Sequence, residues 1–115
     1  MSDAIDSALS ALSAFGEKMN VTANNIANVN TEGFKKSRAV LQEADHGVTV
    51  DISRVNTPGV PIPEEDGTGK MNESSNVDVA EEIVNLQTTK NAFQANLKTI
   101  QTEGEMLGSL FDIFA

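Results

Sequence analysis

The sequence predicts a mainly α fold: two long helices, one at each end of the chain, with a small β-hairpin and an extended linker between them. Three observations lead to this prediction. Apolar residues recur at alternating steps of four and three along the last third of the chain, and again along its first quarter. Between these stretches the apolar period shortens to two. A repeat averaging 3.5 residues predicts a helix that packs on a partner helix, whereas a period of two predicts a strand.

The C-terminal repeat is the stronger of the two and is interrupted only by Lys90 and Gly104. It predicts a helix capped by Asp78 that runs to about Phe111. Left uncovered, so much apolar surface would promote aggregation, so we expect other helices to pack on it. The residues of this repeat are Val79, Ile83, Leu86, Phe93, Leu97, Ile100, Leu107, Phe111 and Phe114.

The N-terminal repeat predicts a helix from about Ser2 to Asn28, with Asp3 and Asp6 near its positive end, where acidic side chains are favourable. Its apolar positions match the C-terminal repeat in spacing, and small neighbours allow another helix to approach closely. The residues of this repeat are Ile5, Ala8, Leu12, Phe15, Met19, Thr22 and Ile26.

Asparagines are concentrated where this first helix ends, at Asn24, Asn25, Asn28 and Asn30. Asparagine is a mediocre helix former because its amide competes for backbone partners. Two interpretations follow: the amides cap the helix locally, or they bond to neighbouring chains. Composition alone favours local capping.

A turn and a short basic run follow the asparagines. Thr31-Glu32-Gly33 predicts the turn, with a positive φ at Gly33. Lys35, Lys36 and Arg38 then complement the negative end of the helix or meet an acidic partner surface.

The middle of the chain predicts a hairpin and then a linker. Val48, Val50 and Ile52 alternate with polar residues, and the segment from Ser37 to Glu43 can pair with them around a turn at 45–47. From Asn56 to Asn76, three prolines and a polar, glycine-rich run predict extended chain. The resulting divisions are 1–32 for the N-terminal helix and its Asn-rich end, 33–76 for the hairpin and linker, and 77–115 for the C-terminal helix.

Charge and composition narrow the classes of partner. The net charge is −9, and residues 1–40 are neutral, so the whole excess lies in the remaining 75 residues. Such a chain repels phosphate backbones, and we expect neither nucleic acid nor membrane insertion. There is no cysteine, which excludes disulfides and thiolate metal sites. The N-terminus has no basic region followed by an apolar run, so we expect no cleaved signal peptide.

The residues do not predict catalysis, a cofactor or a metal site. His46 is the only histidine and is expected to be a solvated turn residue. The GTGK run ending at Lys70 fails the phosphate-loop pattern, because Glu64 and Met71 stand where Gly and Ser or Thr are needed. The acidic run 64–66 lacks the alternating spacing of a calcium loop.

Two long motifs resemble the bacterial flagellar axial proteins, the rod and hook subunits. Residues 9–38, LSALSAFGEKMNVTANNIANVNTEGFKKSR, resemble the N-terminal rod signature of that family. Residues 75–113 resemble its C-terminal helix, including the QAN tripeptide at 94–96. The C-terminal motif is closest to the proximal rod proteins of C type. Phe93 stands where the family commonly has Tyr, which keeps the packing but removes a hydroxyl, and the middle of the chain is shorter than usual.

The resemblance implies an architecture and a role. The terminal helices would pack as an antiparallel coiled coil, and subunits would stack helically, with themselves and with other axial proteins, around a central channel. Export would use the flagellar type III apparatus, and the destination would be the periplasmic rod of the basal body. Signature residues would contact neighbouring subunits, and the resemblance places this interpretation level with local capping. These residues are Asn24, Asn25, Asn28, Asn30, Gly33, Phe34 and Lys35.

A second class of function is a small acidic binding module, such as a type III secretion chaperone, which also uses amphipathic helices and negative charge. The Asn-rich segment and the proline-containing linker favour the structural subunit. A chaperone would be a stable dimer kept in the cytoplasm, whereas a rod subunit would become ordered on assembly.

Overall fold

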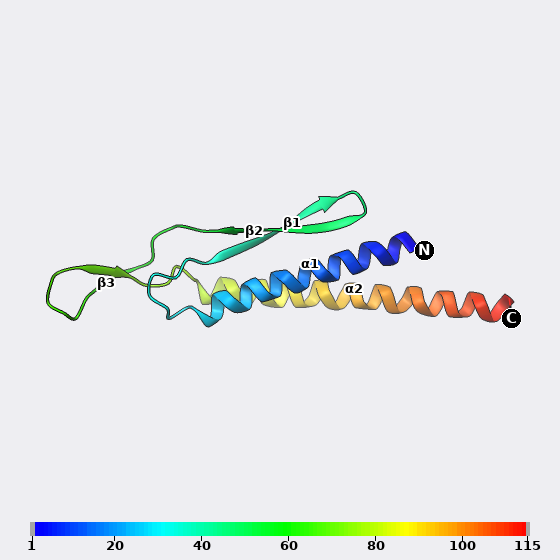
Figure 1. Ribbon diagram of the computed structural model, residues 1–115. Coiled ribbons are helices and arrows are strands. Elements are labelled where there is room, and N and C mark those ends of the chain that lie inside the picture. Colours follow the sequence, from blue (N-terminus) through cyan, green and yellow to red (C-terminus); the bar gives the residue numbers. More distant parts are fainter. Residues whose placement is uncertain (1, 115) are drawn as a thin grey trace.

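The computed structural model describes residues 2–114 and has the predicted fold class. Two helices, α1 (Ser2–Ala27) and α2 (Val79–Phe114), run antiparallel side by side, so that both ends of the chain lie at one end of the molecule (Figure 1). A hairpin of β1 (Ser37–Ala44) and β2 (Gly47–Arg54) lies along α1. The molecule is a rod with extents of 80 × 23 × 16 Å.

The helix ends follow from local capping. Asp78 precedes α2, and its Oδ1 accepts hydrogen bonds from the backbone N–H of Ala80 at 3.0 Å and of Glu81 at 3.4 Å. This confirms the predicted cap. The helix then continues to Phe114, three residues beyond the predicted end at Phe111. After α1, Gly33 has a φ of 73°, which confirms the predicted turn.

The predicted hairpin is confirmed, and its turn is tight. Ala44 pairs with Gly47, so Asp45 and His46 alone make the turn. Gly47 has a φ of 151°, and a Cβ on it would lie 2.5 Å from the Ser10 Oγ of α1. Only glycine therefore allows the turn to approach the helix this closely.

Two side chains of α1 fix the hairpin to the helix, one on each free edge. Ser10 Oγ donates to the Val48 carbonyl at 2.6 Å and accepts from the Val48 N–H at 2.9 Å. Asn25 forms the same pair of hydrogen bonds with Ser37: its Nδ2 donates to the Ser37 carbonyl at 2.8 Å, and its Oδ1 accepts from the Ser37 N–H at 3.0 Å. Each side chain thereby occupies the place of a neighbouring strand and satisfies edge groups that would otherwise be open.

The segment predicted as linker contains a second ribbon. Strands β3 (Pro61–Pro63) and β4 (Met71–Glu73) pair antiparallel, with Ile62 opposite Asn72. Backbone bonds from Ser74 to Val60 and from Glu64 to Lys70 flank the pair. Hydrogen-bonded positions alternate along such a ladder, so both prolines fall where no N–H is required. Proline therefore did not exclude a strand here.

The interior is thin and made of small or polar residues. The buried apolar residues are Ala8, Ala14 and Ala39, and the buried polar ones are Thr22, Asn25, Glu82 and Thr89. No leucine, isoleucine or phenylalanine of the described chain is fully buried. Most of the large apolar side chains thus remain partly or wholly available to other molecules.

Candidate assembly surfaces

The two helices use their predicted apolar positions differently. In α1 every predicted packing residue is half-buried; these are Ile5, Leu12, Phe15, Met19 and Ile26. In α2 the predicted set divides in two. We define the covered line as Leu86, Phe93, Ile100 and Leu107, which are half-buried. We define the open line as Val79, Ile83, Leu97 and Phe111, which are exposed; the ninth residue of the repeat, Phe114, is also exposed.

The division arises because α1 packs on one side of the predicted seam. Residues four apart on a helix differ by about 40°, so Leu97 lies beside Phe93 and turns away from α1. Residues three apart lie about 60° to the other side, and there α1 covers a polar line. The polar line comprises Glu82, Thr89, Asn96 and Glu103, all buried or half-buried.

The polar line leaves polar atoms unsatisfied inside the helix pair. Thr89 Oγ1 and Glu103 Oε2 are buried and have no hydrogen-bond partner among the described residues. An unpaired buried polar group costs about 1–3 kcal/mol. The contact between α1 and α2 is therefore weaker than two apolar seams would make it.

Exposed apolar residues gather most densely at the C-terminal end of α2, which extends beyond the shorter α1. Phe111 is 68% exposed and Phe114 80%. Five large apolar residues are exposed over the last nine described positions: Met106, Leu110, Phe111, Ile113 and Phe114. A contiguous apolar surface of this kind is typical of a protein-binding site.

Two of the four signature asparagines, Asn25 and Asn28, donate side-chain hydrogen bonds within the chain. Asn25 is 2% exposed and holds Ser37, as described above. Asn28 bonds back to the Asn24 carbonyl at 2.9 Å, which is the local capping that composition favoured. Neither interpretation from the sequence anticipated the long-range role of Asn25. Asn24 and Asn30 are exposed, and contact of signature residues with neighbouring subunits remains a prediction.

The remaining signature residues join the end of α1 to the second ribbon. The Gly33 N–H donates to the Glu73 carbonyl at 2.8 Å, and the Phe34 carbonyl accepts from the Asn76 N–H at 3.3 Å. Lys35 Nζ lies 2.7 Å from Glu73 Oε2. The hydrogen bond and charge of Lys35 lower the pKa of the Glu73 carboxyl, so this carboxylate is ionised at neutral pH.

Sequence reasoning missed Asn76, which ties the hairpin base to the start of α2. Its Oδ1 accepts from the Lys36 N–H at 2.7 Å, and its Nδ2 donates to the carbonyls of Val55 at 2.9 Å and Thr57 at 3.0 Å. An Asn just before a helix cap is a common local feature, and nothing in the sequence distinguished this one. Ser10 was missed because a serine inside a helix does not indicate a partner 38 residues away in the chain.

An elongated helix pair with a row of exposed apolar side chains is the architecture of a subunit that its neighbours complete. Comparisons with known proteins agree. Residues 5–35 match the family described as flagella basal body rod protein, and residues 68–113 match the C-terminal family of flagellar basal body rod FlgEFG proteins. The chain is 30% identical to the flagellar basal-body rod protein FlgC of Salmonella typhimurium and 31% identical to that of Escherichia coli O157:H7, over 89% of each chain.

The chain therefore belongs to the flagellar basal-body rod protein family and is a structural rod subunit of the C type. This confirms the resemblance seen in its two terminal motifs. Its place is the basal body, and it assembles with other rod and axial proteins.

Proposed function

We propose that this rod subunit polymerises helically through its terminal helices, with the open line of α2 packing on helices of neighbouring subunits to build part of the axial tube. The observation that carries this proposal is the difference in exposure between the helices. Nine large apolar residues are exposed on α2 and one, Leu9, on α1. A second helix can cover the open line without displacing α1, because the two lie on adjacent sides of α2.

The energy available from this contact is large for a protein of this size. Fully burying one Leu, Ile or Phe side chain is worth about 1.5–3 kcal/mol. Three residues of the open line, Ile83, Leu97 and Phe111, are about half to two-thirds exposed in the free chain, at 54%, 46% and 68%. Burying their exposed parts is worth about 2.5–5 kcal/mol per subunit, which is a substantial fraction of the net stability of a small domain.

Leu97→Asp tests the proposal. An aspartate at the centre of the open line would be buried without a partner on assembly, so we expect rods lacking the subunit and loss of motility. The free subunit should keep its fold, because Leu97 is exposed there. Immunoblots of purified basal bodies and swimming assays measure the result.

The matched control is Ala95→Asp, which places the same charge on the opposite side of α2, about 160° from Leu97. Ala95 is exposed. This variant should assemble and swim normally. Normal rods with Leu97→Asp, or equal failure of both variants, would contradict a specific role for the open line.

We further propose that the subunit reaches the periplasmic rod through the flagellar type III export apparatus, without a cleaved signal peptide. Family membership supports this route, and so does the thin interior, because a weak helix pair is easily unfolded for passage. Cells that lack a functional flagellar export apparatus should retain the subunit inside. Appearance of the subunit in their periplasm would contradict the route.

We expect the subunit to use no enzymatic activity, cofactor or bound metal in this role. Its charge of −9 disfavours nucleic acid as a partner. Among residues 2–114, no helix has the length and apolar character required to cross a membrane. The secretion-chaperone alternative is not favoured, since the relatives that cover nearly the whole chain are rod proteins.

A further inference from the structure

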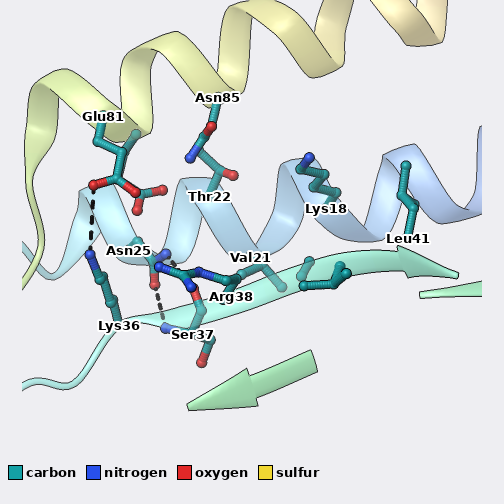
Figure 2. Close-up of a pocket in the computed structure, with 13 residues that line it drawn as sticks. Lys18, Val21, Thr22, Asn25, Lys36, Ser37, Arg38, Leu41, Glu81 and Asn85 are labelled. Atoms are coloured by element: carbon teal, nitrogen blue, oxygen red, sulfur yellow. Dashed lines mark hydrogen bonds and ion pairs between the residues drawn. The ribbon is translucent and has the colours of Figure 1, made fainter. Parts of the chain in front are cut away.

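A groove of about 330 Å³ opens between α1, β1 and the first turns of α2 (Figure 2). Its lining includes Glu82, which is only 4% exposed. Glu82 has no ion pair and no hydrogen bond from its carboxylate to another described residue; the ion pairs here and nearby are Lys36–Glu81 and Lys35–Glu73. The Glu82 carboxylate oxygens are not among the buried atoms that lack a partner, so they reach the groove and can accept a bond from a group that enters it.

Two cations border the same groove. Lys18 reaches in from α1 and Arg38 from β1 (Figure 2). Neither forms an ion pair with the described chain, whereas Lys36 lies 3.8 Å from Glu81. The groove therefore presents two unpaired positive groups and one unpaired negative group.

The opposite set of charges occurs at the tip of the second ribbon. The loop between β3 and β4 carries Glu64, Glu65 and Asp66, followed by Lys70; Glu64 is half-buried and the other three are exposed. Asp66 Oδ1 accepts from the N–H of Thr68 at 3.1 Å and from its hydroxyl at 2.7 Å. These hydrogen bonds hold the turn at the tip and lower the pKa of the Asp66 carboxyl. Asp66 is therefore charged at neutral pH.

The tip cannot fill the groove of its own chain. It projects beyond the helices, at the end away from both termini (Figure 1). At about 1.5 Å per residue, α2 accounts for roughly 54 Å of the 80 Å length of the molecule. About a third of the length is therefore ribbon and loop without a helix beside it, which would lie alongside the next subunit in a stack.

We propose that the ribbon tip of one copy docks into this groove on a second copy, with Glu65 and Asp66 meeting Lys18 and Arg38, and Lys70 meeting Glu82. This contact rests on the proposed polymerisation and adds to it a second, polar interface away from the helix seams. The three groove charges outside the Lys36–Glu81 pair would each meet an opposite charge on the tip, which carries one further acid, Glu64. Complementary charges of this kind set partner choice and register more than they add affinity.

Charge reversal tests the contact in assembled rods. Lys18→Glu with Arg38→Glu should reduce incorporation of the subunit, and Glu65→Lys with Asp66→Lys should do the same. Each exposed pair contributes about two- to fivefold. The four changes together should restore incorporation, because the charges are again opposite. A matched control, Glu43→Lys with Asp51→Lys, alters two exposed acids of the hairpin and should have no effect.

Cross-linking identifies the occupant. The chain has no cysteine, so Lys18→Cys with Asp66→Cys introduces the only reactive pair. Lys18 belongs to α1, whereas Asp66 belongs to the loop between β3 and β4, which projects beyond the helices (Figure 1). Oxidation of rods that contain this variant should give dimers and higher multimers of the subunit. The control pair, Lys98→Cys with Asp66→Cys, should not give multimers, because Lys98 is an exposed residue of α2 that does not line the groove.

The outcomes separate the two levels of inference. Multimers together with rescue by the four-fold reversal support docking between copies. Incorporated subunits without multimers, or cross-links only to another protein, overturn it while leaving polymerisation through the helices intact. Loss of incorporation by Leu97→Asp is independent of either result.

Discussion

The two helices of this subunit carry similar apolar repeats but differ in how much of each repeat is buried within the subunit. Helix α1 lies between α2 and the hairpin, and both of its faces are used: it packs on α2 through its repeat and holds the hairpin through Ser10 and Asn25. Helix α2 contacts α1 alone among the elements of the described chain and leaves its open line exposed. The difference indicates that α1 organises the subunit and α2 joins it to others.

The largest effect is expected from a charge introduced at a buried position of α1, which tests the division of roles between the two helices. Ala14 is 3% exposed and borders the same cavity as Val48 and Val50 of the hairpin. Ala14→Asp should destabilise the free subunit by about 3–5 kcal/mol, because the carboxylate has no partner there. Chemical denaturation of the purified subunit measures this. If Ala14→Asp left folding intact, or if Leu97→Asp abolished it, the division of roles would be wrong.

A smaller effect is expected where α1 holds the hairpin edge. Asn25→Ala removes both hydrogen bonds to Ser37 and leaves its N–H and carbonyl without that partner. We expect a loss of about 2–3 kcal/mol in the free energy of unfolding. Asn24→Ala changes an exposed neighbour and should cost under about 0.5 kcal/mol. Similar values for the two variants would refute the structural role of Asn25.

On the α2 side, one substitution should stabilise the subunit. Thr89 is 2% exposed, and its hydroxyl has no partner among the described residues. Thr89→Val keeps the shape and removes that hydroxyl, so we expect a gain of about 1 kcal/mol in the free energy of unfolding. Thr88→Val, at an exposed position, is the control and should change little. A loss of stability with Thr89→Val would mean that the polar line is better satisfied than its contacts indicate.

The smallest effect concerns the ion pair that links the two halves of the chain. Lys35 lowers the pKa of Glu73, so the pair stabilises the fold at pH values above the unfolded pKa of a glutamate, about 4.3. That contribution is lost as pH falls through the lower pKa of the folded state. Glu73→Gln should therefore be slightly less stable than the natural chain at pH 7 and equal to it near pH 2. Thermal melts at both values measure the difference, and a difference that persisted in acid would exclude this ion pair as its source.

The sequence predicted what depends on periodicity and local chemistry. The two helices, the hairpin with its turn, the cap at Asp78 and the positive φ of Gly33 all follow from neighbours within a few residues. The family followed from long motifs at both ends. These features do not require knowledge of which segments meet.

The features that the sequence did not predict depend on long-range contacts. The apolar repeat of α2 gave no reason to bury Glu82 and Thr89 in place of Ile83. The repeat fixes the position of the apolar line on α2, but it does not specify on which side of that line the partner helix packs. Asn25 lies 12 residues from Ser37, and its role appears only when the hairpin folds back on α1. The second ribbon was missed because its pairing with Met71–Glu73 satisfies the prolines in a way that composition alone does not reveal.

The double attachment of the hairpin has a mechanical consequence. Ser10 and Asn25 are 15 residues apart on one helix, which places the two attachments about 22 Å from each other. A hairpin held to a helix at a single point could rotate about that point. A hairpin held at two separated points must twist together with the helix. Torsion applied to the helices of this subunit is therefore passed on to the hairpin, because the hairpin cannot rotate about a single attachment.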